Sequence, residues 1–474
     1  MRARRIFAGL AVAAAAFAVA GCGGAGGAGS SDLGGAASIA PADSIAFVAL
    51  DSDVSSAQWD AVDGLLRKFP AHDDLLAKLR ATFEKRSKLS WNDDVKPALG
   101  SEVDLVALPG KEPQLVGLTQ GGDRAKLDAL LQKLDKGVAT EQIGDWTAFS
   151  SSSAALDAVK NATTKLSDNN TYRAAVAKLE GDALVRAYAN GTEAQQLLAS
   201  LGKQTPAAAA VPVAWASAEV VASGDGVRVN GYSHDGSTRG SQPEFRRLPA
   251  VPYASSLVDE IPSGALFVAD FQVTPGEFQF STSGPLPAPV QKLLGITPTF
   301  LAELDDVLGG ETALYVRPGL PIPEVTVVTQ PDDVTQAEST LADVLKTLRA
   351  AGAGIKAGID LSSIPVFHKA EGGQLIVSTS QQGIADFTSG GAKLSADPSF
   401  KGAEQASGMP AETTGFLYVN LATSLPLIRA LGPLVGLKLP PGAGQADLGA
   451  LKTLTAFGTR AGQDTTFTVF LEVR

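Results

Sequence analysis

The chain has 474 residues, 45% of them hydrophobic and 19% charged, and a formal net charge of −11. This length allows two or three domains, each with a core of its own. The excess of acid argues against a nucleic-acid partner, which needs clustered lysines and arginines to neutralise phosphates. The single cysteine rules out an intrachain disulfide and a thiolate metal cluster.

The N-terminus has the pattern of a secretion signal that ends in a lipidation site. Three arginines within residues 2–5 precede a mostly apolar run over residues 6–20, which is too short to span a bilayer as a stop-transfer helix. The run ends at Val19-Ala20-Gly21-Cys22, which resembles the lipobox of bacterial lipoproteins. By that resemblance, the signal is cleaved between Gly21 and Cys22, and Cys22 receives a diacylglycerol. An ordinary signal peptide with a chance cysteine explains fewer of these positions.

Lipidation fixes where we expect the protein to lie. Loss of residues 1–21 removes three arginines and leaves 36 basic against 50 acidic residues. Acylated Cys22 offers no thiol to a metal or a substrate, and no other segment has the roughly 18 uninterrupted apolar residues of a spanning helix. The sequence therefore predicts a cell-envelope protein, held on the membrane by a lipid anchor with its body extracytoplasmic.

Residues 22–40 are rich in glycine, serine and alanine, so we expect a flexible tether here. Residues 24–29 also fit the GxGxxG pattern of dinucleotide-binding loops. Because no predicted strand precedes the pattern and no helix follows it, no cofactor is expected at this place.

The chain matches itself at a shift of roughly 210 to 230 residues, which indicates an internal duplication. The matches keep their order along both halves, which composition alone seldom produces. The matched stretches are Ala46–Ala49 with Leu266–Ala269, Leu99–Glu102 with Leu308–Glu311, Pro113–Gln120 with Pro323–Gln330, Phe149–Ser152 with Val377–Ser380, and Lys165–Ser167 with Lys393–Ser395.

We therefore expect an α+β fold with two homologous domains, residues 41–236 and 258–474, joined by a linker at 237–257. Strand-like apolar runs alternate with helical stripes in each half, yet the runs also meet in tight hairpins. Each domain should be a mainly antiparallel sheet with helices packed on one face.

The clearest predicted elements occur in both halves. Asp123 and Asp333 are predicted N-caps, each followed by an apolar stripe at helical spacing. The stripes are Leu127, Leu130, Leu131 and Leu134 in the first half, and Leu341, Val344, Leu345 and Leu348 in the second. The predicted strands are 45–50, 102–108, 114–119, 146–149, 183–189 and 266–271.

Short motifs connect the chain to a known group of sequences. Pro-Ala-Asp at 41–43, Pro-Ala-Glu at 410–412, the two Lys-Leu-Ser blocks before an aromatic residue, and the duplication behind a lipobox resemble an uncharacterised family of secreted bacterial proteins. The resemblance spans about residues 38 to 474. It implies no known activity, cofactor or catalytic residue.

Residues that carry chemistry are sparse. The three histidines, His72, His234 and His368, have no metal-ligand spacing, so no metal site is predicted. Ser200 and Lys203 match the SxxK pattern of penicillin-interacting enzymes, but the companion KTG and SDN motifs are missing. We predict no catalytic residue from these patterns.

Each acidic or hydroxyl cluster has a structural interpretation and a functional one. Asp93-Asp94, Asp305-Asp306, Asp332-Asp333 and Asp51-Ser52-Asp53 are most simply solvated turn or cap acids. Ser150–Ser153 and Ser378–Ser380 either cap helices or hold an anion, and capping is favoured. The proline-rich Leu431–Leu448 either fills a gap between domains or faces a partner.

Three functions remain open. The leading hypothesis is a non-catalytic binding or scaffolding lipoprotein, whose partner would be another envelope protein. The alternative is a carrier of a lipid or other apolar ligand, which an apolar pocket of several hundred Å³ would favour and an unbroken core would oppose. An enzyme with a site not visible in the sequence is third.

Overall fold

The computed structural model describes residues 33–70, 72–110, 114–135, 137–191, 193, 213–236, 251–273, 303–304, 306–319, 323–352, 365–431 and 448–474. Its described residues form two compact units, one up to Gly236 and one from Val251 onward. Several sequence predictions lie outside the described residues: the cleavage and lipidation site at Gly21 and Cys22, the glycine pattern at 24–29, the Ser200 and Lys203 pair, Asp305, and residues 432–447 of the leucine-rich stretch.

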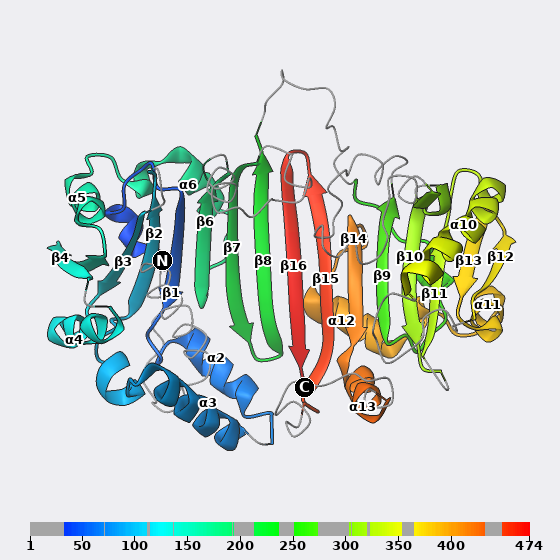
Figure 1. The fold of residues 1–474 in the computed structure, drawn as a ribbon, viewed down its shortest axis with the longest axis horizontal. Helices are drawn as coiled ribbons and strands as arrows, with labels where there is room; N and C mark the ends of the chain where they lie inside the picture. Colours follow the sequence, from blue (N-terminus) through cyan, green and yellow to red (C-terminus); the bar gives the residue numbers. More distant parts are fainter. Residues whose placement is uncertain are drawn as a thin grey trace. The chain divides into compact units, whose positions relative to one another are not determined.

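The first unit is α+β, with a sheet in which every strand is antiparallel to its neighbours (Figure 1). The strand order is β4-β5-β3-β2-β1-β6-β7-β8. The strands are β1 (Ala46–Asp51), β2 (Glu102–Leu108), β3 (Gln114–Gln120), β4 (Ala139–Ile143), β5 (Trp146–Ser150), β6 (Val185–Asn190), β7 (Val213–Ser223) and β8 (Gly226–Asp235).

The second unit is also α+β and antiparallel throughout, with the order β12-β13-β11-β10-β9-β14-β15-β16. The strands are β9 (Phe267–Val273), β10 (Gly310–Arg317), β11 (Glu324–Thr329), β12 (Phe367–Glu371), β13 (Gln374–Ser378), β14 (Gly415–Asn420), β15 (Leu451–Ala461) and β16 (Asp464–Val473).

Helices fill the connections between strands. In the first unit these are η1 (Gly35–Ser38), α2 (Ala57–Leu66), α3 (His72–Ser87), η2 (Trp91–Val95), α4 (Arg124–Leu134), α5 (Ser153–Asn161), η3 (Leu166–Asp168) and α6 (Asn170–Val176). In the second they are η6 (Leu257–Asp259), α10 (Val334–Gly352), α11 (Gln381–Thr388), η8 (Leu394–Ala396), α12 (Pro398–Ser407) and α13 (Leu421–Leu431).

The two strand orders correspond strand for strand, beginning with β4 and β12 and finishing with β8 and β16. The registers correspond as well: the Ile45 N–H donates to the Ala107 carbonyl, and the Leu266 N–H donates to the Val316 carbonyl. Isolated bridges also recur, Pro41 with Lys165 and Pro262 with Lys393. Positions in the two units can therefore be compared residue by residue.

One sequence match is wrong by a single residue. Matching Ala46–Ala49 with Leu266–Ala269 pairs Phe47 with Phe267, but the register places Val268 where Phe47 lies. Phe47 and Val268 are both buried in the core, whereas Phe267 is half-exposed. A shift of one residue turns every side chain of a strand to the other face of the sheet. The match therefore aligned similar residue types that lie on opposite faces.

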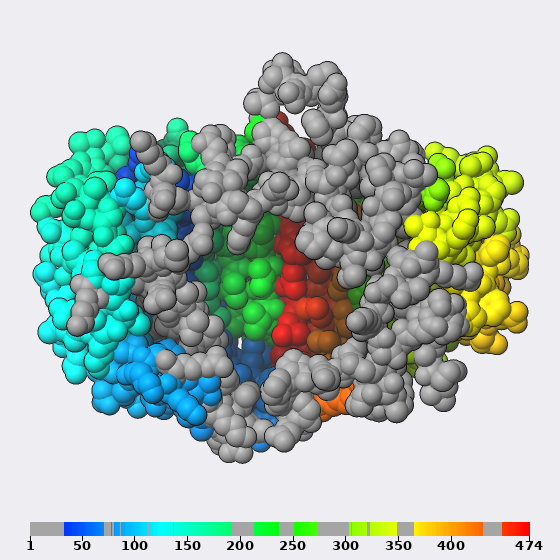
Figure 2. All heavy atoms as spheres, viewed as in Figure 1, coloured from blue at the N-terminus to red at the C-terminus, as the bar shows by residue number. Residues whose placement is uncertain are grey.

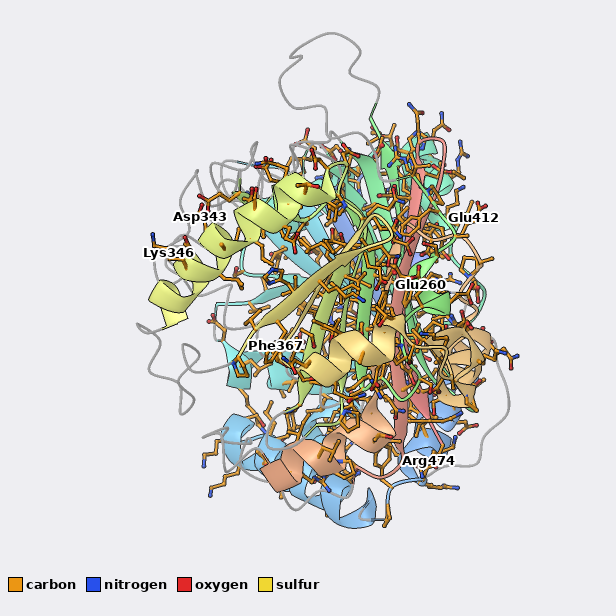
Figure 3. All side chains as sticks on the ribbon, turned by 90° about the vertical axis from the view of Figure 1, so that its right-hand side faces the viewer. Glu260, Asp343, Lys346, Phe367, Glu412 and Arg474 are labelled. Carbon is orange, nitrogen blue, oxygen red and sulfur yellow. The ribbon has the colours of Figure 1, made fainter. Side chains whose placement is uncertain are left out.

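Helices pack on both faces of each sheet, so the prediction of helices on one face is wrong. In the first unit Phe149 packs with the α4 leucines, while its neighbour Ala148 packs with α5 residues. In the second unit Leu375 packs with α10 and Ile376 with α11 and α12. Successive strand residues point to opposite faces, and Figure 3 shows α10 and α12 on opposite sides of the strands.

The described ends of the predicted tether and linker are in contact with the two units. Residues 33–40 are packed on the first unit, where Ala36 and Ala40 are 0% exposed. Tyr253 pairs with Thr413 in the second unit, and Leu257 is 0% exposed there. Small side chains and a low-complexity sequence favoured a flexible segment. Alanine nevertheless fits where the chain runs close to a sheet. Contacts between residues distant in sequence determine whether such a segment packs.

The cap and stripe predictions are confirmed where the structure describes them, and the side chain of Leu348 lies outside that part. Asp123 caps α4 by accepting from the Lys126 N–H, and Asp333 accepts from the N–H groups of Thr335 and Gln336. The buried stripe residues are Leu127, Leu130, Leu131, Leu341 and Val344. Within the described part of the chain, no helix combines the length and apolarity that crossing a membrane requires.

We predict that Leu127→Ala and Leu341→Ala each destabilise their own unit by about 2 to 5 kcal/mol, because each removes a nearly inaccessible side chain and leaves a cavity. All four tryptophans lie in the first unit, so urea unfolding of Leu127→Ala is followed by tryptophan fluorescence and that of Leu341→Ala by circular dichroism. The exposed Gln132→Ala serves as control. Equal midpoints for Leu127→Ala and this control would contradict the buried placement of the stripe.

Candidate functional site

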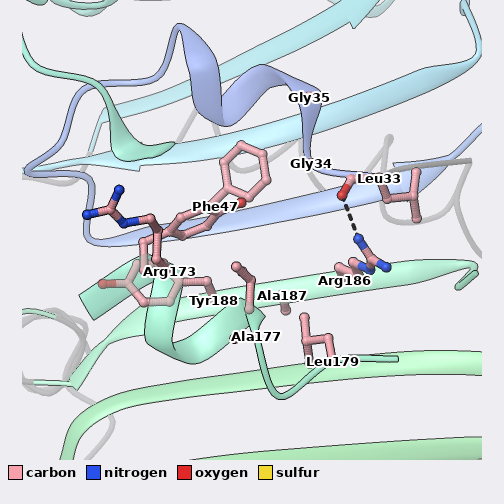
Figure 4. Close-up of a pocket in the computed structure, with 12 residues that line it drawn as sticks. Leu33, Gly34, Gly35, Phe47, Arg173, Ala177, Leu179, Arg186, Ala187 and Tyr188 are labelled. Carbon is pink, nitrogen blue, oxygen red and sulfur yellow. Dashed lines mark hydrogen bonds between the residues drawn. The ribbon is translucent and has the colours of Figure 1, made fainter. Parts of the chain in front are cut away.

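A pocket of about 390 Å³ opens in the first unit. Its walls come from three places: the N-terminal strap, which we define as residues 33–40, the end of α6 with the turn after it, and strands β1 and β6 (Figure 4). This volume lies in the range of small-molecule sites. The lining residues are Leu33, Gly34, Gly35, Phe47, Tyr172, Arg173, Val176, Ala177, Leu179, Arg186, Ala187 and Tyr188.

Glycine lets the strap run close to the sheet. A side chain at Gly35 would come within 3.1 Å of the Trp146 ring, and one at Gly34 within 3.3 Å of the Tyr172 hydroxyl. Gly34 also has a φ of +108°, in the region that favours glycine. The same residues that suggested a flexible tether therefore shape one wall of the pocket.

Two charged side chains fasten the strap. The Glu102 carboxylate accepts hydrogen bonds from the N–H groups of Gly34 at 2.7 Å and Gly35 at 3.1 Å. The Arg186 guanidinium donates to the Leu33 carbonyl at 2.9 Å (Figure 4). Hydrogen bonds to charged groups are the strong ones in proteins, so these bonds hold the strap over the pocket.

Arg186 belongs to a row of polar residues that crosses the sheet. Directly opposite pairs in antiparallel strands share a face. The row runs Asp104, Ala49, Arg186, Glu219, Asn230 over β2, β1, β6, β7 and β8. Glu219 accepts from the Asn230 amide at 3.0 Å and from the Glu180 N–H at 2.7 Å, so this face carries charges inside the fold.

The second unit has two phenylalanines in the same row, beside Asp270 and Thr468. There the row runs Ala313, Asp270, Phe416, Phe457, Thr468. Arg186 and Glu219 thus correspond to two phenylalanines. Glu219 is buried and Arg186 is half-buried, and charges inside a fold cost free energy unless paired, so their replacement by phenylalanine in the second unit directs attention to the first unit as the candidate site.

The aromatic residues beside the pocket can be compared with their equivalents in the second unit. Tyr172 packs edge-on against Tyr188 with ring centroids 5.1 Å apart, and Phe400 packs against Tyr418 in the same way at 5.2 Å. Burial raises the pKa of the Tyr188 hydroxyl, which therefore stays a neutral donor. Its oxygen has no hydrogen-bond partner among the described residues.

Each unit also buries a pair of carboxyl groups that the sequence analysis did not identify. The pairs are Glu102 with Asp104 and Asp270 with Glu311. Burial, and then the Glu102 carboxyl, raise the pKa of Asp104 well above its ordinary value. In the second unit burial raises the pKa of Asp270 to about 7, against the hydrogen bonds that it receives from Tyr253 and Ser255. Both aspartates are at most 1% exposed.

The sequence feature that could have identified these acids is their position inside strands. Adjacent acids drew attention, but neighbours in a strand face opposite ways, whereas residues two apart face the same way. Glu102 and Asp104 have that spacing inside an apolar run, and Asp270 interrupts a strand predicted as buried. An acid inside a buried strand is therefore the pattern that could have found them.

The serine clusters are helix caps, as favoured. Ser152 accepts from the Ala155 N–H at the start of α5, and Ser380 accepts from the Gly383 N–H at the start of α11. Their hydroxyls donate to Gln114 and Glu324, and Ser150 donates to the Leu115 carbonyl. Because these hydroxyls are used internally, the anion-site interpretation has no support here.

The acidic turns are mostly caps, with one correction. Asp94 pairs with Lys133 at 2.6 Å, and Asp333 caps α10. Asp51 was expected to be solvated, yet it is 2% exposed, and burial raises its pKa to about 6 although it accepts hydrogen bonds from Ser56 and from the Asp53 N–H. Asp51 ends an inner strand and accepts a hydrogen bond from Ser56, the N-cap of α2, so the start of that helix helps to enclose it.

The histidines are placed separately. His72 begins α3, as predicted. His234 was expected in a turn but lies in β8, where it stacks on Trp215 with ring centroids 5.7 Å apart. His368 lies in β12 with its Nε2 3.5 Å from Glu338. The described residues contain no group of three metal-ligating side chains.

Comparisons with known proteins leave the family open. No protein-family model and no curated protein matches the chain. Among solved structures, it is similar to crystal form III of TP0453 at 11% identity and a TM-score of 0.24, over 46% of this chain and 88% of that one. It is similar to the prenyltransferase PriB in complex with L-tryptophan and dimethylallyl thiolodiphosphate at 13% identity and a TM-score of 0.13, over 87% and 95%. Both scores are too low to support an inference about function.

The buried aspartates predict a stability that falls as pH rises. A carboxyl whose pKa is raised from 3.8 to about 7 stabilises the fold while protonated, and this contribution is lost as pH rises through the folded value. Between about pH 5 and about pH 8 the loss from Asp270 is roughly 2 to 3 kcal/mol. Asp270→Asn should remove that part of the pH dependence.

The measurement is urea unfolding followed by circular dichroism at the two pH values. Asp343→Asn, on the exposed side of α10 (Figure 3), is the matched control and should keep the pH dependence of the natural chain. If Asp270→Asn and Asp343→Asn show the same pH dependence, Asp270 is not the group that titrates.

Proposed function

We propose that the protein is an extracytoplasmic lipoprotein that binds an apolar small molecule in the pocket of the first unit and catalyses no reaction on it. The observation that carries the proposal is the pocket itself, whose walls include Leu33, Phe47, Val176 and Leu179. Apolar walls with a few polar groups are typical of small-molecule sites. We therefore favour small-molecule binding over scaffolding as the function.

The comparison between units supports this choice. In the second unit, phenylalanine and tyrosine side chains form a core around Phe400 and Phe416. In the first unit Arg186 takes the place of Phe416, and the strap carries glycines. A ligand of this pocket would place its apolar part against Phe47 and Val176 and a hydrogen-bond acceptor near Tyr188 or the two arginines.

Scaffolding remains the second candidate because of one exposed face. In the second unit, the sheet face opposite to Phe416 presents Leu417, Ala456 and Val469 half-exposed, and Phe467 is 51% exposed. Figure 2 shows β15 and β16 at the surface on this side. Exposed apolar patches mark interaction sites, so an envelope protein that docks here is the competing proposal.

We also infer that the two units arose by internal duplication. The inference is supported by the ordered sequence matches, the corresponding strand orders and the recurring proline–lysine bridges. On this view the second unit kept an apolar core, while the first acquired charges and a pocket. Duplication followed by divergence would explain why one unit binds and the other supports.

The lipid anchor is the first part of the proposal to test. If Cys22 is acylated, Cys22→Ser should release the protein from membranes into the soluble fraction. Stable attachment needs two or more acyl chains, because a single chain gives an association constant of only about 10⁴ M⁻¹. The readout is the distribution between pellet and supernatant after a salt wash, with the natural chain as control. A Cys22→Ser protein that still pellets would contradict the anchor.

The pocket is tested with the neutral fluorescent probe N-phenyl-1-naphthylamine. Ala177→Trp places a large ring at an exposed position of the pocket wall and should weaken probe binding by at least about tenfold, which is 1.4 kcal/mol. The matched control is Gln405→Trp, because Gln405 takes the corresponding exposed place on α12. Native mass spectrometry of detergent-extracted protein then identifies any ligand that co-purifies.

Two outcomes would contradict the proposal. A natural chain that neither binds the probe nor carries a ligand would argue for scaffolding instead. Equal loss of binding in Ala177→Trp and Gln405→Trp would place the probe outside this pocket.

A further inference from the structure

The strap is a wall of the pocket and also the first described segment of the chain. Leu33, Gly34 and Gly35 are three of the lining residues. Because the remaining walls come from α6, β1 and β6, a ligand in the pocket lies against the strap on one side. Movement of the strap away from the sheet would therefore open that side of the pocket.

The corresponding segment of the second unit, residues 254–261, is also fastened by a glutamate. Glu311 accepts hydrogen bonds from the N–H groups of Ser256 at 3.1 Å and Leu257 at 3.0 Å. It also accepts from the hydroxyls of Ser255 at 2.7 Å and Ser256 at 2.6 Å. A buried glutamate on β2 or β10 thus ties the chain to each sheet.

The two segments carry apolar side chains of different size at two equivalent buried positions. The Leu166 N–H donates to the Ala40 carbonyl, and the Leu394 N–H donates to the Ile261 carbonyl, which makes Ala40 and Ile261 equivalent. By the same count Ala36 corresponds to Leu257, and all four residues are 0% exposed. Hydrophobic stabilisation grows with the apolar area buried, so alanine holds the strap less firmly than leucine or isoleucine holds its counterpart.

The second segment has further anchors. Tyr253 and Thr413 exchange two backbone hydrogen bonds, at 2.9 and 3.0 Å, and the Tyr253 hydroxyl donates to Asp270 at 2.5 Å. The strap is held by the charged side chains of Glu102 and Arg186 and by buried Leu33. A segment that a few strong polar bonds hold in place can open locally while the rest of the fold stays intact.

We propose that residues 33–40 are a gate for the pocket of the first unit, latched by Glu102 and Arg186, and that unfastening this gate sets the rate at which ligand enters and leaves. The inference rests on the proposed function, since a gate needs a ligand to admit. Ten residues separate Cys22 from Leu33. In the proposed lipoprotein, the gate is therefore the part of the body closest along the chain to the lipid anchor.

The test compares Glu102→Gln with Glu311→Gln in the full mature chain. Glutamine keeps the shape of glutamate and removes its charge, so each variant weakens one fastening with little change in packing. The probe is N-phenyl-1-naphthylamine, and stopped-flow fluorescence gives its association and dissociation rates. We expect Glu102→Gln to raise both rates by about tenfold, because the open state becomes more populated, and Glu311→Gln to leave both rates within about twofold.

A second measurement and a second variant keep the test independent of misfolding. Hydrogen exchange at the Gly34 and Gly35 amides should accelerate in Glu102→Gln, while exchange in β1 stays unchanged. Arg186→Gln, which frees the Leu33 carbonyl, should also raise the probe rates if the tryptophan fluorescence spectrum remains that of the natural chain.

The outcomes separate the gate from the binding proposal. If the natural chain does not bind the probe, the proposed function fails. If it binds and Glu102→Gln has unchanged rates, the pocket stands and the gate is overturned. If Glu311→Gln raises the rates as much as Glu102→Gln does, general loosening explains the effect and the gate is also overturned.

Discussion

A buried carboxylate on the second strand of each sheet ties the start of each unit to its core. Glu102 holds the N–H groups of Gly34 and Gly35, and Glu311 holds those of Ser256 and Leu257. Backbone N–H groups at a chain turn have no strand partner, and leaving them unpaired inside a protein costs more than the bond itself is worth. The carboxylates satisfy these groups, so the strap and its counterpart can lie over the sheet without a strand of their own.

Once that constraint is met, the two units use the space beneath differently. In the second, Phe400, Phe416 and Phe457 join one continuous core. In the first, Arg186 and Glu219 occupy two of the corresponding row positions, and the pocket lies beside them. The same sheet scaffold therefore tolerates either an apolar core or charged residues beside a pocket at equivalent positions.

The buried acids also show how strand geometry concentrates polar groups. Asp104 faces Ala49 across β1 and β2, and Asp270 faces Ala313 across β9 and β10, so each unit places one aspartate and one alanine at the same pair of positions in reversed order. The alanine leaves room for a carboxyl group next to the glutamate. Burial then raises the aspartate pKa in both units.

Much of the local structure was readable in the sequence. Asp123 and Asp333 cap their helices, the Leu127 and Leu341 stripes are buried, and Ser152 and Ser380 are the helix caps within the two hydroxyl clusters. These features depend on neighbours within a few residues, so propensity and periodicity decide them. The α+β class and the antiparallel pairing follow from the same local patterns.

The tertiary structure decided the rest. From the sequence we placed residues 33–40 in a tether, put the helices on one face of each sheet, and aligned Phe47 with Phe267. All three predictions were wrong because each feature depends on contacts with distant parts of the chain. The pocket is made of residues from 33 to 188 that no spacing rule connects, and the pairing of Glu102 with the strap spans 68 residues. Local chemistry determines which elements form, whereas contacts distant in sequence determine which side chains meet, and the candidate site consists entirely of the latter.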